Sequence, residues 1–101
     1  MTRRLIIRPE AEIDVADAVA WYEDQRTGLG NELLDELDSV ISRVVESPFQ
    51  FPHIRHQVRR ALLSRFPYSV YFRVSDEAVE LVAMLHHHRD PRTWQRRIAA
   101  K

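Results

Sequence analysis

Apolar residues recur at two different periods along the chain, and the first half follows a helical period. Residues 5–7 form a short β-prone run that Pro9 stops, which predicts a first strand. The next apolar stripe has helical spacing and consists of Ala11, Val15, Ala18, Val19 and Tyr22. A longer helical stripe follows two glycines and consists of Leu33, Leu34, Leu37, Val40, Ile41, Val44 and Val45. Pro48 ends it, so an antiparallel helix pair is expected.

The second half of the chain follows the period of two that is typical of half-buried strands. Residues 58–64 and 69–74 predict two strands, and 75–77 is a polar turn. The run 79–85 is apolar on both faces apart from Glu80, which favours a strand near the centre of the sheet. Asp90 before Pro91 is a helix-start signal, so a short terminal helix containing Trp94 is expected.

These elements predict an α+β fold built on a small antiparallel sheet. We expect an N-terminal strand, a two-helix hairpin packed on one face, a three-strand meander and a short C-terminal helix. A length of 101 residues fits a single domain, residues 1–101. The apolar runs are too short to span a membrane, and the N-terminus lacks the features of a secretory signal. We therefore expect a cytoplasmic protein that binds no membrane and needs no cofactor.

The net charge of zero conceals two halves of opposite sign. Residues 1–50 hold 11 acidic and 5 basic residues, whereas 51–101 hold 4 acidic and 10 basic residues and all five histidines. A basic surface attracts phosphate or an acidic protein surface, so the two halves can serve different partners. The alternative is that the halves mainly neutralise each other across the fold.

Three stretches of the sequence form a combined pattern. The first is residues 8–12 with Asp14 and Trp21 beyond them; the second runs from 60 to 74. The third is the ending His86, Arg89, Asp90, Pro91, Trp94 and Arg97. Together these stretches span nearly the whole chain, and they resemble the RelE/ParE toxin superfamily, in particular its ParE-like (plasmid stabilisation) members.

The resemblance implies a type II toxin-antitoxin system in which a cognate antitoxin neutralises the toxin. The antitoxin wraps the toxin with one segment and binds operator DNA with another, so the toxin contacts DNA only through its partner. A sheet edge is one candidate surface for the wrapping segment. The other is a second apolar line on the first helix, formed by Ile13, Ala16 and Ala20, although small exposed residues there also serve simply as helix formers.

Members of the superfamily act on one of two targets, ribosome-bound mRNA or DNA gyrase, and the residues of this chain can be compared with both. RelE-type members are endoribonucleases that cut mRNA on the ribosome; a nuclease here would draw on Arg60, Arg73, His86 and Arg89. If the last strand continued past His86, then His86 and His88 would share a face near Arg73. Nuclease members commonly carry a tyrosine or an added histidine near the C-terminus, and residues 92–101 contain neither. This departure favours the ParE branch, whose members inhibit DNA gyrase by binding.

A gyrase-binding surface is expected at the C-terminal end, with an aromatic anchor among basic residues: Arg89, Arg92, Trp94, Arg96 and Arg97. The structural alternative is that Trp94 covers the end of the sheet and the arginines are solvated. We expect no metal site at residues 86–88, because neighbouring strand positions alternate faces and no carboxylate lies at ligand spacing. A non-toxic member that only binds antitoxin, and an unrelated nucleic-acid-binding domain, are the remaining alternatives.

Overall fold

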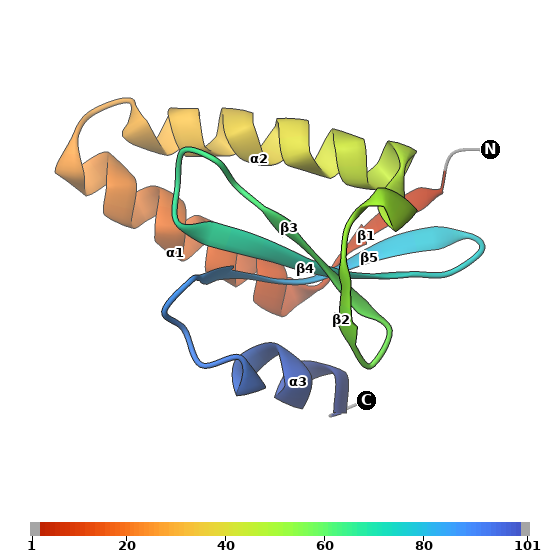
Figure 1. Cartoon of the computed structure of the whole chain (residues 1–101). Coiled ribbons are helices and arrows are strands. Elements are labelled where there is room, and N and C mark those ends of the chain that lie inside the picture. Colours follow the sequence, from red (N-terminus) through yellow and green to blue (C-terminus); the bar gives the residue numbers. More distant parts are fainter. Residues whose placement is uncertain (1–2, 100–101) are drawn as a thin grey trace.

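The computed structural model describes residues 3–99, which form a mixed sheet between two helical layers (Figure 1). The strands are β1 (Arg4–Ile7), β2 (His53–Arg55), β3 (Val58–Leu62), β4 (Tyr68–Val74) and β5 (Ala78–His86). The helices are α1 (Pro9–Gln25), α2 (Leu29–Glu46), the short 3-10 helix η1 (Pro48–Gln50) and α3 (Arg92–Ala99). The expected α+β class and order of elements are confirmed. No helix within residues 3–99 is both long and apolar enough to cross a membrane.

The helical hairpin follows directly from the apolar stripes and from the residues at its turn. Pro9 is the first residue of α1, where its missing N–H costs no hydrogen bond. Between the helices, Gly28 adopts a φ of +92°, a left-handed conformation that glycine tolerates best. The carboxylate of Glu23 accepts the backbone N–H groups of Gly28 at 2.9 Å and Gly30 at 3.0 Å. These bonds fix the turn and bring both stripes onto one face of the sheet.

The strand order is β1-β5-β4-β3-β2, so β5 has a neighbour on each side. The meander of β3, β4 and β5 is antiparallel as expected, whereas β1 pairs with β5 in parallel, with Arg4 opposite Ala78 and Ile7 opposite Leu81. No hairpin turn joins β1 to β5, because the helices and three strands lie between them in sequence. The local pattern therefore could not set the direction of this pairing.

Both faces of the sheet are covered, which explains why β5 is apolar on both sides. On the hairpin face, Ala18 of α1 and Leu33 of α2 are buried in one core with Phe72 of β4. On the opposite face, where α3 lies (Figure 1), Val58, Tyr71 and Val82 are buried in a second core with Trp94 of α3. The terminal helix thus forms a third layer, and its start is capped as expected: the Asp90 carboxylate accepts the Arg92 backbone N–H at 2.9 Å.

Two local features differ from the pattern-based expectation. The three-residue strand β2 pairs with β3 through a tight turn at His56 and Gln57, both of which have positive φ (54° and 62°). Neither residue signals such a turn, which usually contains asparagine and glycine. At the other end of the sheet, β5 stops at His86, and the following histidines lie in a turn. The condition under which His86 and His88 would share a strand face is therefore not met.

Candidate functional site

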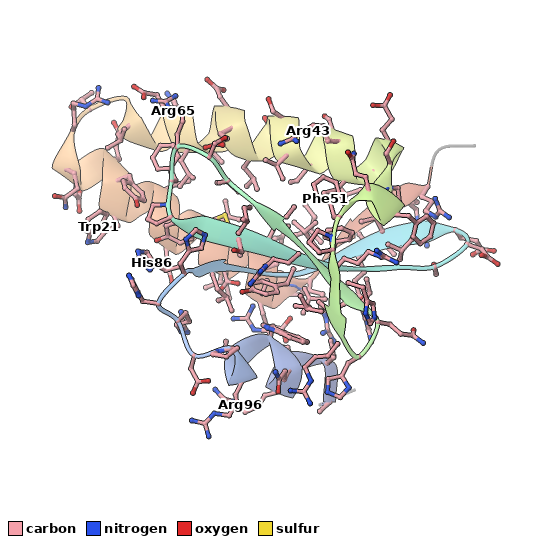
Figure 2. All side chains as sticks on the ribbon, in the orientation of Figure 1. Trp21, Arg43, Phe51, Arg65, His86 and Arg96 are labelled. Atoms are coloured by element: carbon pink, nitrogen blue, oxygen red, sulfur yellow. The ribbon has the colours of Figure 1, made fainter. Side chains whose placement is uncertain are left out.

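A cleft with a volume of about 230 Å³ opens between α1 and the end of β5, and we call it the α1–β5 cleft. Its lining residues come from α1, β4, β5 and the turn after β5: Asp14, Asp17, Ala18, Trp21, Tyr68, Met84, His86 and Arg89. Figure 2 shows Trp21 and His86 on the same side of the molecule. The cleft therefore joins an exposed aromatic ring, carboxylates, a histidine and an arginine.

Three aromatic rings of the cleft, Trp21, Tyr68 and His86, are connected through Tyr22, which packs against the core behind them. Trp21 contacts Tyr22 edge-on with 4.9 Å between ring centroids, Tyr22 lies 6.1 Å from Tyr68, and Tyr68 lies 5.3 Å from His86. Burial raises the pKa of the Tyr68 hydroxyl, Tyr22 adds to this effect, and the positive charge of Arg89 opposes it. The hydroxyl is therefore a neutral hydrogen-bonding group at physiological pH.

The turn after β5 places Arg89 at the mouth of the cleft. His87 donates its backbone N–H to Pro67 O at 2.9 Å, and Arg89 donates to His86 O at 2.9 Å. His88 donates its backbone N–H to Nδ1 of His86 at 3.1 Å, and the two imidazole rings stack with centroids 5.2 Å apart. This contact fixes the His86 ring and makes Nδ1 an acceptor.

Trp94 is buried and is not an exposed anchor, which agrees with the structural alternative that it covers the sheet. Its side chain is only 2% exposed and stacks on Tyr71, with 5.6 Å between ring centroids and 21° between planes. Trp21 is the exposed tryptophan, at 57%. Trp21 lies outside the apolar stripe of α1, about 100° around the helix from Tyr22, and this position was the signal for its exposure.

Arg97 is likewise held inside the fold. It donates two hydrogen bonds to the Asp14 carboxylate, at 2.7 and 3.0 Å, and one to Val82 O at 3.1 Å. Its pKa is raised above the usual value, chiefly by hydrogen bonding to Asp14, while burial acts in the opposite direction. Because Asp14 neutralises its charge, Arg97 does not add a free positive charge to the surface where the sequence analysis placed it.

The other three arginines of the expected surface, Arg89, Arg92 and Arg96, are exposed. They differ in whether a carboxylate neutralises their charge. Arg92 forms an ion pair with Asp90 at 2.8 Å, and hydrogen bonding to Arg92 lowers the pKa of Asp90 to about 2. Arg96 and Arg89 form no ion pair within 4.0 Å in the described part of the chain. Arg96 projects from α3, as Figure 2 shows. The unpaired positive charge is thus provided by Arg89 and Arg96.

The four residues considered for a nuclease do not converge. Tyr68 pairs with His86 in register, and Arg73 lies five residues further along β4, so His86 and Arg73 are about 17 Å apart along the sheet. Arg73 also forms an ion pair with Glu80 at 2.9 Å, and Glu80 contacts Arg8 at 3.4 Å. Arg60 lies beside Tyr71 on the α3 face. Of the four, only His86 and Arg89 lie together, in the α1–β5 cleft, so the convergence that the sequence left possible is not seen.

The apolar line considered for antitoxin binding is exposed on the outer face of α1. Ile13 is 60% exposed, and Ala16 and Ala20 are exposed as well. Residues 3–99 contain no group of three or more histidine, aspartate or glutamate side chains arranged to hold a metal ion.

Comparison with known proteins gives full-length sequence similarity to a toxin and a shared fold with a chain of a solved toxin-antitoxin structure. No family model matches the chain. The chain is 28% identical over 102 aligned positions to Toxin ParE2 of Mycobacterium tuberculosis, in strains CDC 1551 / Oshkosh and ATCC 25618 / H37Rv, covering 100% of this chain and 97% of the relative.

A solved structure, the chromosomal ParDE TA system from P. aeruginosa, contains a chain with the same fold. The TM-score is 0.74 at 17% identity, and the match covers 84% of this chain and 96% of the other. The full-length sequence similarity to a ParE toxin and the fold shared with a chain of a ParDE system agree with each other. The chain thus resembles ParE toxins in sequence and in fold.

Proposed function

We propose that this chain is the toxin of a type II toxin-antitoxin system that acts in the cytoplasm by binding DNA gyrase. The full-length similarity to a ParE toxin supports the toxin role. The observation that carries the choice of mechanism is the separation of Arg73 from His86 by about 17 Å, with Arg73 paired to Glu80. RNA cleavage needs its proton-transfer and charge-stabilising groups within contact of one phosphodiester, and of the four residues considered only His86 and Arg89 lie that close together.

The target-binding surface that we propose is the α1–β5 cleft, which includes Arg89, together with Arg96 of α3. Exposed tryptophan and arginine are the residue types that contribute most to protein interfaces, and Trp21 supplies the aromatic anchor that we had expected from Trp94. The two unpaired arginines favour an acidic or phosphate-bearing partner. A gyrase-DNA complex presents both kinds of surface.

We further propose that a cognate antitoxin neutralises the toxin by covering the chain. Ile13, Ala16 and Ala20 form one surface that suits an apolar helix, because small alanine side chains allow close approach of a second backbone. Operator DNA is contacted through the antitoxin alone. Under this proposal the free chain is toxic and the complex is inert.

The test uses the purified full-length chain in two parallel assays, gyrase supercoiling and cleavage of ribosome-bound mRNA. We expect inhibition of supercoiling with intact mRNA. Trp21→Ala and Arg96→Glu should weaken inhibition by about tenfold each, the effect of losing one interface anchor. Arg43→Glu is the matched control for Arg96→Glu, because Arg43 is exposed on α2, away from the proposed surface (Figure 2).

Each alternative function predicts a different result. Cleavage of mRNA with unaffected gyrase would show a RelE-type endoribonuclease. Absence of both activities, with tight antitoxin binding, would show a member that only binds antitoxin. Either result contradicts the proposal.

A further inference from the structure

Two hollows adjoin Arg73 on the face of the sheet that carries α3. The first, of about 370 Å³, is lined by Arg73 with Gln57 of the β2–β3 turn and Glu80 of β5. The second, of about 250 Å³, is lined by Arg73 with His56 of the same turn and Gln95 of α3. Polar side chains from three further elements thus surround Arg73. We call these five residues and the two hollows the Arg73 site.

The ion pairs at this site leave one positive charge in excess. Nη2 of Arg73 lies 2.9 Å from Oε1 of Glu80, and Nε of Arg8 lies 3.4 Å from Oε2 of the same carboxylate. Within residues 3–99, neither arginine forms an ion pair with a second carboxylate. The side chains of Arg73, Glu80 and Arg8 are only 26%, 23% and 14% exposed. An excess charge with limited access to water attracts an anion.

Glu80 leaves one edge of the Arg73 guanidinium free. Nε and Nη2 both donate to Oε1 of Glu80, at 3.2 and 2.9 Å. In the part of the chain that the structure describes, Nη1 donates to no protein acceptor, and no buried side-chain nitrogen lacks a partner. Nη1 is therefore accessible from outside the protein. A guanidinium edge of this kind matches the geometry of phosphate and carboxylate oxygens.

The side chains of His56, Gln57 and Gln95 bring further hydrogen-bond donors to the same place. Among the described residues, 3–99, none of the three donates to or accepts from another part of the chain. An amide donates through its NH2 group, and an imidazole donates through at least one ring nitrogen. Together with Arg73, four side chains therefore present free donors around the two hollows.

The backbone beside Arg73 departs from regular geometry at two places. His56 and Gln57 are consecutive residues with a left-handed conformation, which is strained for side chains of this size. The pairing of β4 with β5 shifts between Tyr71 and Phe72, so Val82 has no partner opposite it. Strained residues and β-bulges concentrate at binding sites, where they aim particular side chains. Here the strained turn places one donor side chain in each hollow.

We propose that the Arg73 site binds a terminal phosphate group, with Nη1 of Arg73 as its charged anchor. Such a group carries a charge of about −1.5 to −2 at pH 7 and three acceptor oxygens. It matches the excess positive charge and the four donor side chains better than a carboxylate, which has a single charge and two oxygens. Inorganic phosphate and the phosphate monoester of a small organic molecule share this chemistry.

NMR titration of the full-length chain at constant ionic strength tests the inference with four probes: inorganic phosphate, adenosine monophosphate, adenosine and acetate. We expect saturable shifts of the Arg73 Nε–H and of the His56 and Gln57 amides with both phosphates, and none with adenosine or acetate. Binding of the monophosphate about tenfold or more tighter than inorganic phosphate would identify a monoester as the ligand. Equal affinity would identify phosphate itself.

Three results of the same titrations would overturn the inference. Acetate that shifts these signals with the affinity of phosphate would show a carboxylate site. Phosphate that perturbs the exposed Arg43 as strongly as Arg73 would show only non-specific attraction. An oligonucleotide without terminal phosphates that binds more tightly than the monophosphate would show a site for a nucleic-acid backbone.

Two variants locate the binding by affinity. Arg73→Lys retains the charge and the pairing with Glu80 but lacks the free Nη1 edge, and it should weaken phosphate binding by about tenfold. Gln95→Ala removes one donor and should weaken it by about 2- to 10-fold. Arg43→Lys, on α2, is the matched control and should bind as the wild type does (Figure 2).

Unchanged urea midpoints in these variants exclude misfolding as the cause of weaker binding. If Arg73→Lys and Gln95→Ala both bind phosphate as tightly as the wild type, phosphate does not bind at the Arg73 site. The inference goes beyond the proposed function and is tested apart from it, because Arg73 lies about 17 Å along the sheet from His86 of the α1–β5 cleft.

Discussion

Arg97 and Asp14, which lie 83 residues apart in sequence, together close the edge of β5 at the point where β1 ends. Arg97 donates to Val82 O at 3.1 Å, and the Asp14 carboxylate accepts the Met84 backbone N–H at 3.0 Å. Their own two hydrogen bonds join α3 to α1. An ion pair thus takes the place of a strand at these two backbone groups.

Removing one partner of this ion pair should destabilise the fold strongly. The two side chains are only 15% and 9% exposed, so Arg97→Met leaves an unpaired carboxylate with little water around it. We expect a loss of about 3 kcal/mol in the free energy of unfolding, measured by urea denaturation. The double variant with Asp14→Asn should lose less than the sum of the single changes. Single changes costing under about 0.5 kcal/mol would contradict a structural role.

Truncation of Trp94 should affect stability rather than target recognition. Trp94→Ala removes a buried ring stacked on Tyr71 and should lower the free energy of unfolding by about 3 to 5 kcal/mol. Trp94→Phe should cost less and retain gyrase inhibition. In a Trp21→Phe background, the fluorescence of Trp94 should resist acrylamide quenching. Strong quenching of the folded chain would show that Trp94 is exposed.

Glu36 should make stability depend on acidic pH. Burial raises the pKa of this carboxyl, but hydrogen bonds from the backbone N–H and hydroxyl of Ser64 and from the Arg65 N–H outweigh burial and hold the pKa below 4.5. A carboxyl with a lowered folded-state pKa stabilises the fold above its unfolded pKa and loses that effect as pH falls through the folded value. The wild type should therefore exceed Glu36→Gln in urea midpoint at pH 7, and the difference should shrink below pH 4.5. A constant difference between pH 7 and pH 3 would exclude this linkage.

Two turns with positive φ should respond in opposite directions to substitution. Gln57→Gly should stabilise the chain by up to about 1 kcal/mol, because a side chain at a φ of 62° is strained. Gly28→Ala should destabilise it by about 1 kcal/mol through backbone conformation alone, since a Cβ there contacts nothing within 4 Å. Thermal unfolding measures both changes. A loss of stability in Gln57→Gly would indicate that the side chain contributes more than its strain costs.

Periodicity predicted most of the elements because each buries a regular stripe or alternation. The stripe containing Leu33 and Val44 is buried on the sheet, and Asp90 caps α3 as its sequence indicated. The three residues of β2 hold no such pattern, and the parallel pairing of β1 depends on contacts far apart in sequence.

The site was harder to predict, because its composition did not reveal which side chains are already paired. Arg97 and Trp94 belong to the same basic and aromatic segment as Arg96. Arg97 is nevertheless paired with the distant Asp14, and Trp94 is stacked on Tyr71. Conversely, Trp21 is brought beside His86 only when α1 packs along β5. Burial and long-range pairing decide which residues of a motif remain available for binding.

The most direct test of the central claim compares wild type with Arg73→Met and His86→Ala in gyrase supercoiling and in cleavage of ribosome-bound mRNA. A toxin that acts by binding gyrase should leave the mRNA intact in all three cases, and Arg73→Met should inhibit supercoiling as wild type does once its folding is verified. Cleavage of mRNA by wild type that both substitutions abolish would contradict the account, because it would require these separated residues to act at one phosphodiester.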